Sequence, residues 1–260
     1  MAIVTLKDSS IVKPAGKTPT GLMFIPDNDQ FISISHLPTV YFYHSPSNQE
    51  LIANAAETLK HSLSKVLEIF YPLAGRLQWI AGGNRLELDC NAMGALFVEA
   101  ESDSKIEDFG DFSSTLEARS PLTPSVDYNK PIHEMPMLLV QLTRFSCGGI
   151  SLGLGVCHVI ADGQSSIHFV NEWTRIARGE KARDFPFIDR TILKPNRCDL
   201  PRFDHSEFGE VPLLIGQSDS LEERKKETVV AILKLTKEQI EKLKNKANEN
   251  NNHANRPFTR

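Results

Sequence analysis

Residues 150–170, ISLGLGVCHVIADGQSSIHFV, change their hydrophobic pattern at one point, and this change constrains the fold more than any other feature. Up to Cys157, apolar and small residues alternate, which is typical of a β-strand. From residue 164 onwards, apolar side chains recur at helical spacing. The helical stripe consists of Ile167, Val170, Trp173 and Ala177. The sequence therefore predicts a strand, a tight connection through Asp162 and Gly163, and a helix.

The rest of the chain mixes strand and helix patterns in the same way. Residues 37–45, LPTVYFYHS, are rich in β-branched and aromatic residues and predict a strand. Residues 50–70 carry apolar side chains at three- and four-residue intervals and predict an amphipathic helix. Residues 85–100 predict two strands around a turn, and residues 137–157 predict an antiparallel pair. The fold class is therefore α/β, a mixed sheet with flanking helices.

The composition changes after residue 180. Residues 181–225 are rich in proline and charge without a sustained period, which is typical of a linker. Residues 226–260 then predict one strand, TVVAILKL, and one helix, in which Thr236 and Gln239 have capping-box spacing. One strand and one helix cannot bury their apolar faces alone. The expected organisation is a first domain over 1–180, a crossover linker over 181–225 and the start of a second domain over 226–260.

Composition and cysteine spacing exclude several classes of function. The net charge of -4 argues against a nucleic-acid partner. No apolar run approaches the roughly 20 residues that span a bilayer, and no secretory leader is recognised, so we expect a cytoplasmic protein without a membrane partner. The four cysteines lie far apart without metal-ligand spacing, so we expect reduced thiols and no metal site.

His158 is the candidate catalytic residue. It follows the last strand residue, at the kind of strand end where sheets place reactive groups. An imidazole held neutral can accept a proton at neutral pH. Alternation turns Cys157 away from His158, which argues against a Cys-His nucleophile pair. A histidine four residues before an aspartate is common by chance, so a purely structural His158 stays open. Asp162 either orients the loop or caps the following helix.

Two further features have a structural and a functional interpretation. One strand face carries only small residues, including Gly153 and Gly155, and permits close approach by a ligand or by another element of the fold. The acidic segment 99–111 is either a solvated loop or a surface that attracts a polycation.

Three motifs in order carry a resemblance to a known family. HVIADG at 158–163, YPLAGRL at 71–77 and LPTVYFY at 37–43 resemble the BAHD family of plant acyl-CoA-dependent acyltransferases. The resemblance extends over essentially the whole chain. It implies the N-terminal domain of a two-domain, chloramphenicol-acetyltransferase-like fold, monomeric at full length. It also implies acyl-CoA as a co-substrate, with no bound cofactor.

The resemblance also implies roles for individual residues. His158 would be the general base of an HxxxDG motif, Asp162 would hold the motif loop, and Gly163 would allow its tight turn. Thr39 and Tyr41 match positions that line the acceptor pocket in relatives, although both are equally explained as ordinary strand residues.

Within this family the sequence is similar to the spermidine hydroxycinnamoyl transferases, which implies transfer of a hydroxycinnamoyl group from its CoA thioester to a polyamine. Two alternatives remain: a hydroxyl acceptor such as shikimate, and a truncated member that only binds a partner or ligand. The resemblance implies a second domain of similar size beyond residue 260. We therefore expect the 260-residue chain alone to be inactive and to aggregate.

Overall fold

The computed structural model describes residues 4–45, 54–80, 82, 85–109, 120–194 and 235–249. The chain divides into two compact units, Met1–Glu227 and Thr228–Arg260. Helix α7 (Lys237–Glu249) belongs to the second unit, and all other described elements belong to the first.

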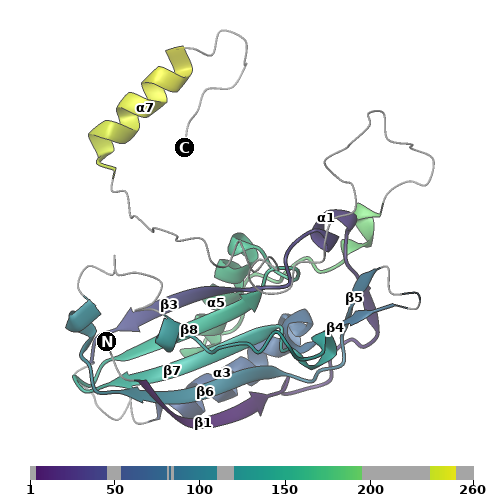
Figure 1. The fold of residues 1–260 in the computed structure, drawn as a ribbon, viewed down its shortest axis with the longest axis horizontal. Coiled ribbons are helices and arrows are strands. Elements are labelled where there is room, and N and C mark those ends of the chain that lie inside the picture. The colour runs from purple at the N-terminus through teal and green to yellow at the C-terminus, as the bar shows by residue number, and fades with distance from the viewer. Residues whose placement is uncertain are drawn as a thin grey trace. The chain divides into compact units, whose positions relative to one another are not determined.

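A five-stranded mixed sheet is the centre of the first unit (Figure 1). Its strands are β1 (Val4–Val12), β3 (His36–Tyr43), β6 (Ala95–Ser102), β7 (Leu138–Phe145) and β8 (Ile150–Cys157). They are ordered β1-β6-β7-β8-β3, with β6 and β7 parallel and the other neighbours antiparallel. The expected antiparallel pair is β7 and β8, whose connection is closed by a hydrogen bond from Phe145 N to Gly149 O at 2.9 Å.

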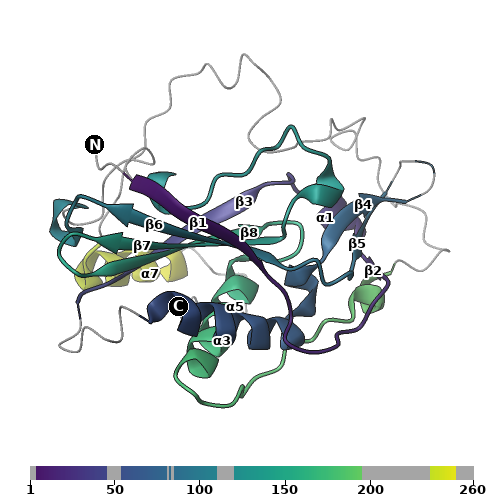
Figure 2. The ribbon, with the colours of Figure 1, turned by 90° about the horizontal axis from the view of Figure 1, so that it is seen from below.

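Two long helices, α3 (Ala55–Ile69) and α5 (Gly163–Ala177), lie on one face of this sheet and pack against each other (Figure 2). Between them, the Trp173 indole N–H donates to Ser62 Oγ at 2.9 Å in the buried interface. The predicted stripe of α5 is correct at Val170 and Trp173 and wrong at Ile167, which is 58% exposed. The buried stripe lies instead over Phe169, Val170, Glu172 and Trp173, the side turned toward α3 and the sheet.

The two strands expected over residues 85–100 exist, but they do not pair with each other. The first, β5 (Leu86–Asp89), lies in a separate three-stranded sheet between β2 (Leu22–Phe24) and β4 (Arg76–Trp79), and the second is β6 of the main sheet. Gly94 ends the turn with φ +95°, where a Cβ would lie 2.5 Å from the Val12 carbonyl oxygen. The turn therefore passes between the sheets against β1.

The remaining short elements connect these layers. They are α1 (Asp27–Gln30) and the 3-10 helices η1 (Tyr71–Ala74), η2 (Ile106–Phe109), η3 (Ser120–Leu122), η4 (Ile132–Glu134) and η5 (Arg190–Leu193). The first motif residues of YPLAGRL form η1, and the motif continues into β4. The guanidinium of Arg76 is buried there and donates to the Gly75 and Gly94 carbonyls at 2.7 and 2.8 Å.

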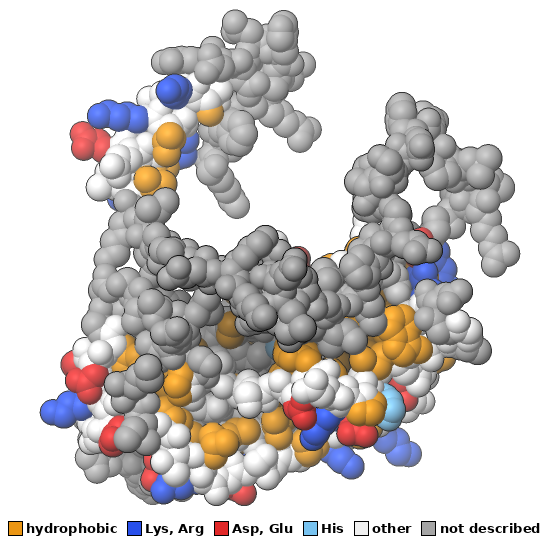
Figure 3. All heavy atoms as spheres, in the orientation of Figure 1, with side chains coloured by type: hydrophobic (Ala, Val, Ile, Leu, Met, Phe, Trp, Pro, Cys, Tyr) orange, Lys and Arg blue, Asp and Glu red, His pale blue; other side chains and the backbone are white. Residues whose placement is uncertain are grey.

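The acidic segment expected to be a loop begins inside the main sheet. Glu99 is a β6 residue, and its carboxylate accepts from Lys60 at 2.7 Å and from Arg144 at 3.1 Å. Glu101 pairs with Lys7 at 2.8 Å. Charged side chains of both signs are interspersed among the described residues visible in Figure 3.

In the second unit, the predicted capping box at the start of α7 is confirmed. Thr236 N donates to Gln239 Oε1 at 2.8 Å, and Gln239 N donates to Thr236 Oγ1 at 3.2 Å. Most of the strand expected over residues 228–235, and most of the expected linker, lie in residues 195–234, outside the described residues.

Candidate active site

The loop that carries the HxxxDG motif leaves the end of β8 and enters α5. His158 N donates to the Ser35 carbonyl at 2.9 Å, which attaches the start of the loop to the chain just before β3. Ile160 N and Ala161 N both donate to the Cys157 carbonyl, at 3.0 and 3.1 Å. The predicted strand, turn and helix are therefore present, with His158 at the first turn position.

The His158 side chain is half-buried. Its Nδ1 is buried and has no hydrogen-bond partner among the described residues. Asp162 therefore makes no hydrogen bond to this nitrogen, and its Oδ1 accepts instead from Ser165 N at 2.8 Å. The buried Nδ1 is out of reach of a bound molecule, so the nitrogen that could accept a proton from an acceptor is Nε2. With Nε2 in that role, the geometry is compatible with a general base.

Asp162 is the N-cap of α5, one of the two roles considered for it. Its backbone is extended, and its carboxylate accepts from the backbone N–H of Ser165, the third residue of α5. The Ser165 backbone and hydroxyl hydrogen bonds lower the pKa of Asp162, with a smaller contribution from the charge of His158.

Loss of this cap has a measurable cost. Asp162→Ala is expected to lower the free energy of unfolding by about 1 kcal/mol, whereas Asp162→Asn keeps an acceptor and most of the stability. Because the folded-state pKa is depressed, the carboxylate contributes above the unfolded-state value of about 3.9 and loses its contribution as the pH falls through the folded-state pKa. Urea denaturation across pH measures this; a deficit of Asp162→Ala that stays constant into acid would contradict the cap.

Gly163 is the first residue of α5, and the structure gives no conformational reason for a glycine there. Its φ lies outside the left-handed region, and a Cβ would have no neighbour within 4 Å. The turn lies before Asp162, over residues 158–160, and is closed by the bonds of Ile160 N and Ala161 N to the Cys157 carbonyl. The role expected for Gly163 in the turn is therefore not required by this geometry.

Thr39 and Tyr41 lie on the edge strand β3, opposite Leu154 and Leu152 of β8. Thr39 is exposed, while Tyr41 packs partly against the main core, and burial raises its pKa. Within the described part of the chain no hydrogen bond joins either side chain to His158. The structure places both on the strand whose start adjoins His158, and brings neither into contact with it.

A second histidine, His36, lies beside the start of the motif loop and was not identified from the sequence. His36 pairs with Cys157 in the sheet, and its Nε2 lies 2.7 Å from the Pro136 carbonyl oxygen, so Nε2 carries a proton. Its Nδ1, 3.1 Å from Tyr128 Oη, then accepts from the tyrosine, while Tyr128 Oη accepts from His36 N at 2.9 Å. Burial lowers the pKa of His36, so this ring is a neutral, fully engaged structural group.

Cys157 cannot serve as a nucleophile at neutral pH. Its thiol is fully buried, and burial raises its pKa to about 12. A thiol in this state carries almost no thiolate. This agrees with the expectation that Cys157 and His158 do not form a catalytic pair.

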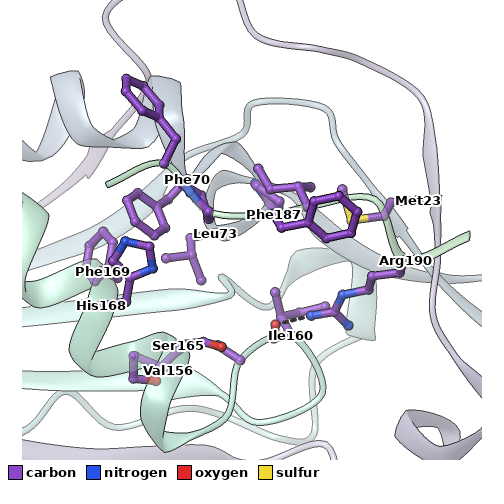
Figure 4. A pocket seen from close by; sticks show the side chains of 16 residues that line it. Met23, Phe70, Leu73, Val156, Ile160, Ser165, His168, Phe169, Phe187 and Arg190 are labelled. Carbon is purple, nitrogen blue, oxygen red and sulfur yellow. Dashed lines mark hydrogen bonds between the residues drawn. The ribbon is translucent and has the colours of Figure 1, made fainter. Parts of the chain in front are cut away.

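A pocket of about 220 Å³ lies beside the motif loop (Figure 4). Apolar side chains from Phe70, η1, α5 and the segment 185–188 form much of its wall. Ser165, His168 and Arg190 are polar members, and His158 is not among its lining residues. The volume is below that of most ligand pockets, roughly 300–1,000 Å³. It is therefore too small for a whole acyl-CoA.

Arg190 is the other residue that the sequence analysis overlooked. It lies in the segment expected to be a linker, and its guanidinium donates to the carbonyls of Val159 and Ile160 in the motif loop. It also pairs with Asp29 of α1 at 3.1 Å. A lone arginine in an irregular, charged segment carries no local signal of such a contact.

The described residues contain no group of three or more His, Cys, Asp or Glu side chains that could hold a metal ion. Among the helices that the structure describes, none combines the length and apolar character needed to cross a bilayer.

The sequence is similar to those of known proteins along most of its length. It is 47% identical over 247 residues to the hydroxycinnamoyl-CoA:piscidic acid hydroxycinnamoyltransferase of Actaea racemosa, with 95% of this chain and 54% of that protein covered. It is 43% identical over 254 residues to the shikimate O-hydroxycinnamoyltransferase of Nicotiana tabacum, with 97% and 58% covered. The chain thus spans about half the length of these relatives.

The fold has a match among solved structures. The crystal structure of vinorine synthase superposes with a TM-score of 0.63 at 32% identity, covering 72% of this chain and 46% of that one. The mixed sheet with flanking helices is thus the N-terminal part of a chloramphenicol-acetyltransferase-like fold, as expected. A family model described as the Transferase family matches residues 2–260. The chain therefore belongs to the Transferase family, the BAHD acyl-CoA-dependent acyltransferases that its motifs resemble.

Proposed function

We propose that the protein containing this chain transfers a hydroxycinnamoyl group from its CoA thioester to a hydroxyl acceptor, with His158 as the general base. The observation that carries this proposal is the placement of His158. Its half-buried ring stands at the end of β8 with Nδ1 unpartnered among the described residues, in a chain whose relatives are named as hydroxycinnamoyltransferases.

The chemistry needs no covalent intermediate on the protein. His158 takes the proton of the acceptor hydroxyl as its oxygen attacks the thioester carbonyl carbon. The tetrahedral intermediate then collapses, the carbon–sulfur bond breaks, and the CoA thiolate leaves and takes up the proton. The nearest thiol, Cys157, is buried with a pKa of about 12, which favours this direct route over an acyl-cysteine.

The choice of acceptor rests on the relatives and on the charges of the sheet. One relative is named for O-acylation of shikimate and the other for piscidic acid, so the expected spermidine acceptor has no support in these names. The acidic segment that suggested a polycation also gives little support, because Glu99 is neutralised by Lys60 and Arg144 and Glu101 pairs with Lys7.

The proposal includes a second domain. Residues 1–180 would supply the base and one wall of a substrate tunnel, residues 181–225 would cross over, and residues 226–260 would begin the domain that supplies the other wall. This explains a chain that spans about half of its relatives and a pocket too small for acyl-CoA.

An acceptor-dependent assay on the whole protein tests the function. Thiol release from p-coumaroyl-CoA is followed with shikimate or spermidine, and the product is identified by mass spectrometry. We expect release with the hydroxy acid and a product heavier than the acceptor by one coumaroyl group. Release only with spermidine would overturn the hydroxyl acceptor, and no release with a broad set of acceptors would favour the non-catalytic alternative.

A further inference from the structure

The motif loop has backbone oxygens that its own turn does not satisfy. Val159 and Ile160 are buried, at 1% and 6% exposure, and the loop N–H groups of Ile160 and Ala161 are already bonded to Cys157. Buried carbonyls left without a donor are costly, so the loop needs a donor from elsewhere.

Arg190 supplies that donor from a distant part of the sequence. Its Nη1 lies 3.3 Å from the Val159 oxygen, and its Nη2 donates to the Ile160 oxygen, the bond drawn as a dashed line in Figure 4. The planar guanidinium can address both oxygens in a fixed geometry, which the point charge of a lysine cannot.

Asp29 of α1 fixes the guanidinium from the other side. Asp29 Oδ2 accepts from Arg190 Nη1 at 3.1 Å, and the side chains are only 25% and 30% exposed. The motif loop is thereby tied to α1 through Arg190. The two carbonyls that it holds directly follow His158 in the chain.

We infer that Arg190 is a positioning residue, which holds the Val159–Ile160 backbone so that the His158 ring keeps its place at the end of β8. The inference rests on the proposed role of His158 for its effect on catalysis. The structural part of the inference, that the position of the His158 ring depends on Arg190, can be tested without an activity assay.

The chain offers a matched control in Arg85. Arg85 also pairs with an α1 carboxylate, Asp27, and donates to a backbone carbonyl, that of Ile25, at a similar exposure of 27%. Its carbonyl partner is outside the motif loop. Loss of Arg85 should therefore cost comparable folding stability without displacing His158.

The experiment compares Arg190→Met and Arg85→Met in the whole protein by three readouts: thermal unfolding, kcat and KM for p-coumaroyl-CoA, and the imidazole NMR signals of histidine-labelled protein. The His158 signal is assigned by its absence from His158→Gln. For Arg190→Met we expect a shifted or broadened His158 signal and a loss of about 100-fold in kcat with little change in KM, because small misplacements of a reacting group have effects of this order. For Arg85→Met we expect the His158 signal and kcat of the wild type.

The outcomes separate this inference from the proposed function. An unchanged His158 signal in folded Arg190→Met, or equal effects of the two variants on that signal and on kcat, would overturn the positioning role. If the wild type transfers no acyl group, the proposed function fails, while the His158 signal still decides the role of Arg190. If Arg190→Met does not fold, Arg190→Lys takes its place: a smaller shift in the same direction supports the inference, and wild-type behaviour in both readouts overturns it.

Discussion

His158→Gln in the whole protein is expected to lower kcat by about 1,000-fold, the size of effect usual for loss of a general base. The fold should be unaffected. The Nδ1 of His158 has no hydrogen-bond partner among the described residues, and the contact that attaches the residue to Ser35 is made by its backbone N–H, which glutamine retains.

The measurement is steady-state release of CoA with the preferred acceptor, alongside a thermal melt. His61→Gln is the control, since His61 is an exposed residue of α3 and its loss should leave both quantities unchanged. Wild-type turnover in a correctly folded His158→Gln protein would show that His158 is not the base. His158 would then have a purely structural role at the end of β8.

The elements around His158 could be predicted because they depend on residues that are neighbours in the sequence. The strand, the turn and the start of α5 follow from a change of period and from an aspartate suited to capping, and both are properties of neighbouring residues. The capping box of α7 was predictable for the same reason. The sequence also placed Cys157 on the opposite strand face from the alternate residues Leu154 and Val156.

The parts that escaped prediction depend on contacts between residues distant in sequence. Arg190 reaches Val159 across 31 residues and Asp29 across 161, and the Tyr128 partner of His36 lies 92 residues away. The strand β1 was missed because most of its side chains are exposed and its register shifts between Leu6 and Asp8, which erases the alternation. The two strands of residues 85–100 enter different sheets because the Gly94 turn packs against β1, a contact that no local pattern encodes.

Substitution of Gly153 is expected to have the second large effect, a loss of folding stability. The small-residue face of β8 is covered there by another segment of the same chain. A Cβ at Gly153 would lie 1.9 Å from the Leu122 carbonyl oxygen, far inside van der Waals contact. The same segment is held to the sheet by Gln141, whose Nε2 donates to the Pro121 oxygen at 2.8 Å. Of the two interpretations of this face, close packing by another element is the one that the structure shows at Gly153.

Gly153→Ala is therefore expected to lower the free energy of unfolding by about 3 kcal/mol, at the upper end of the usual cost of overpacking, because backbone on both sides must move. Gly155→Ala is the matched control two residues along the same strand. Its Cβ would meet His36 and Leu139 at 3.5 Å, an ordinary contact, so stability should change by less than about 1 kcal/mol. Urea denaturation of both variants measures the difference. Equal losses would mean that the strand backbone itself requires glycine at both positions, and that the approach of Leu122 is not what fixes residue 153.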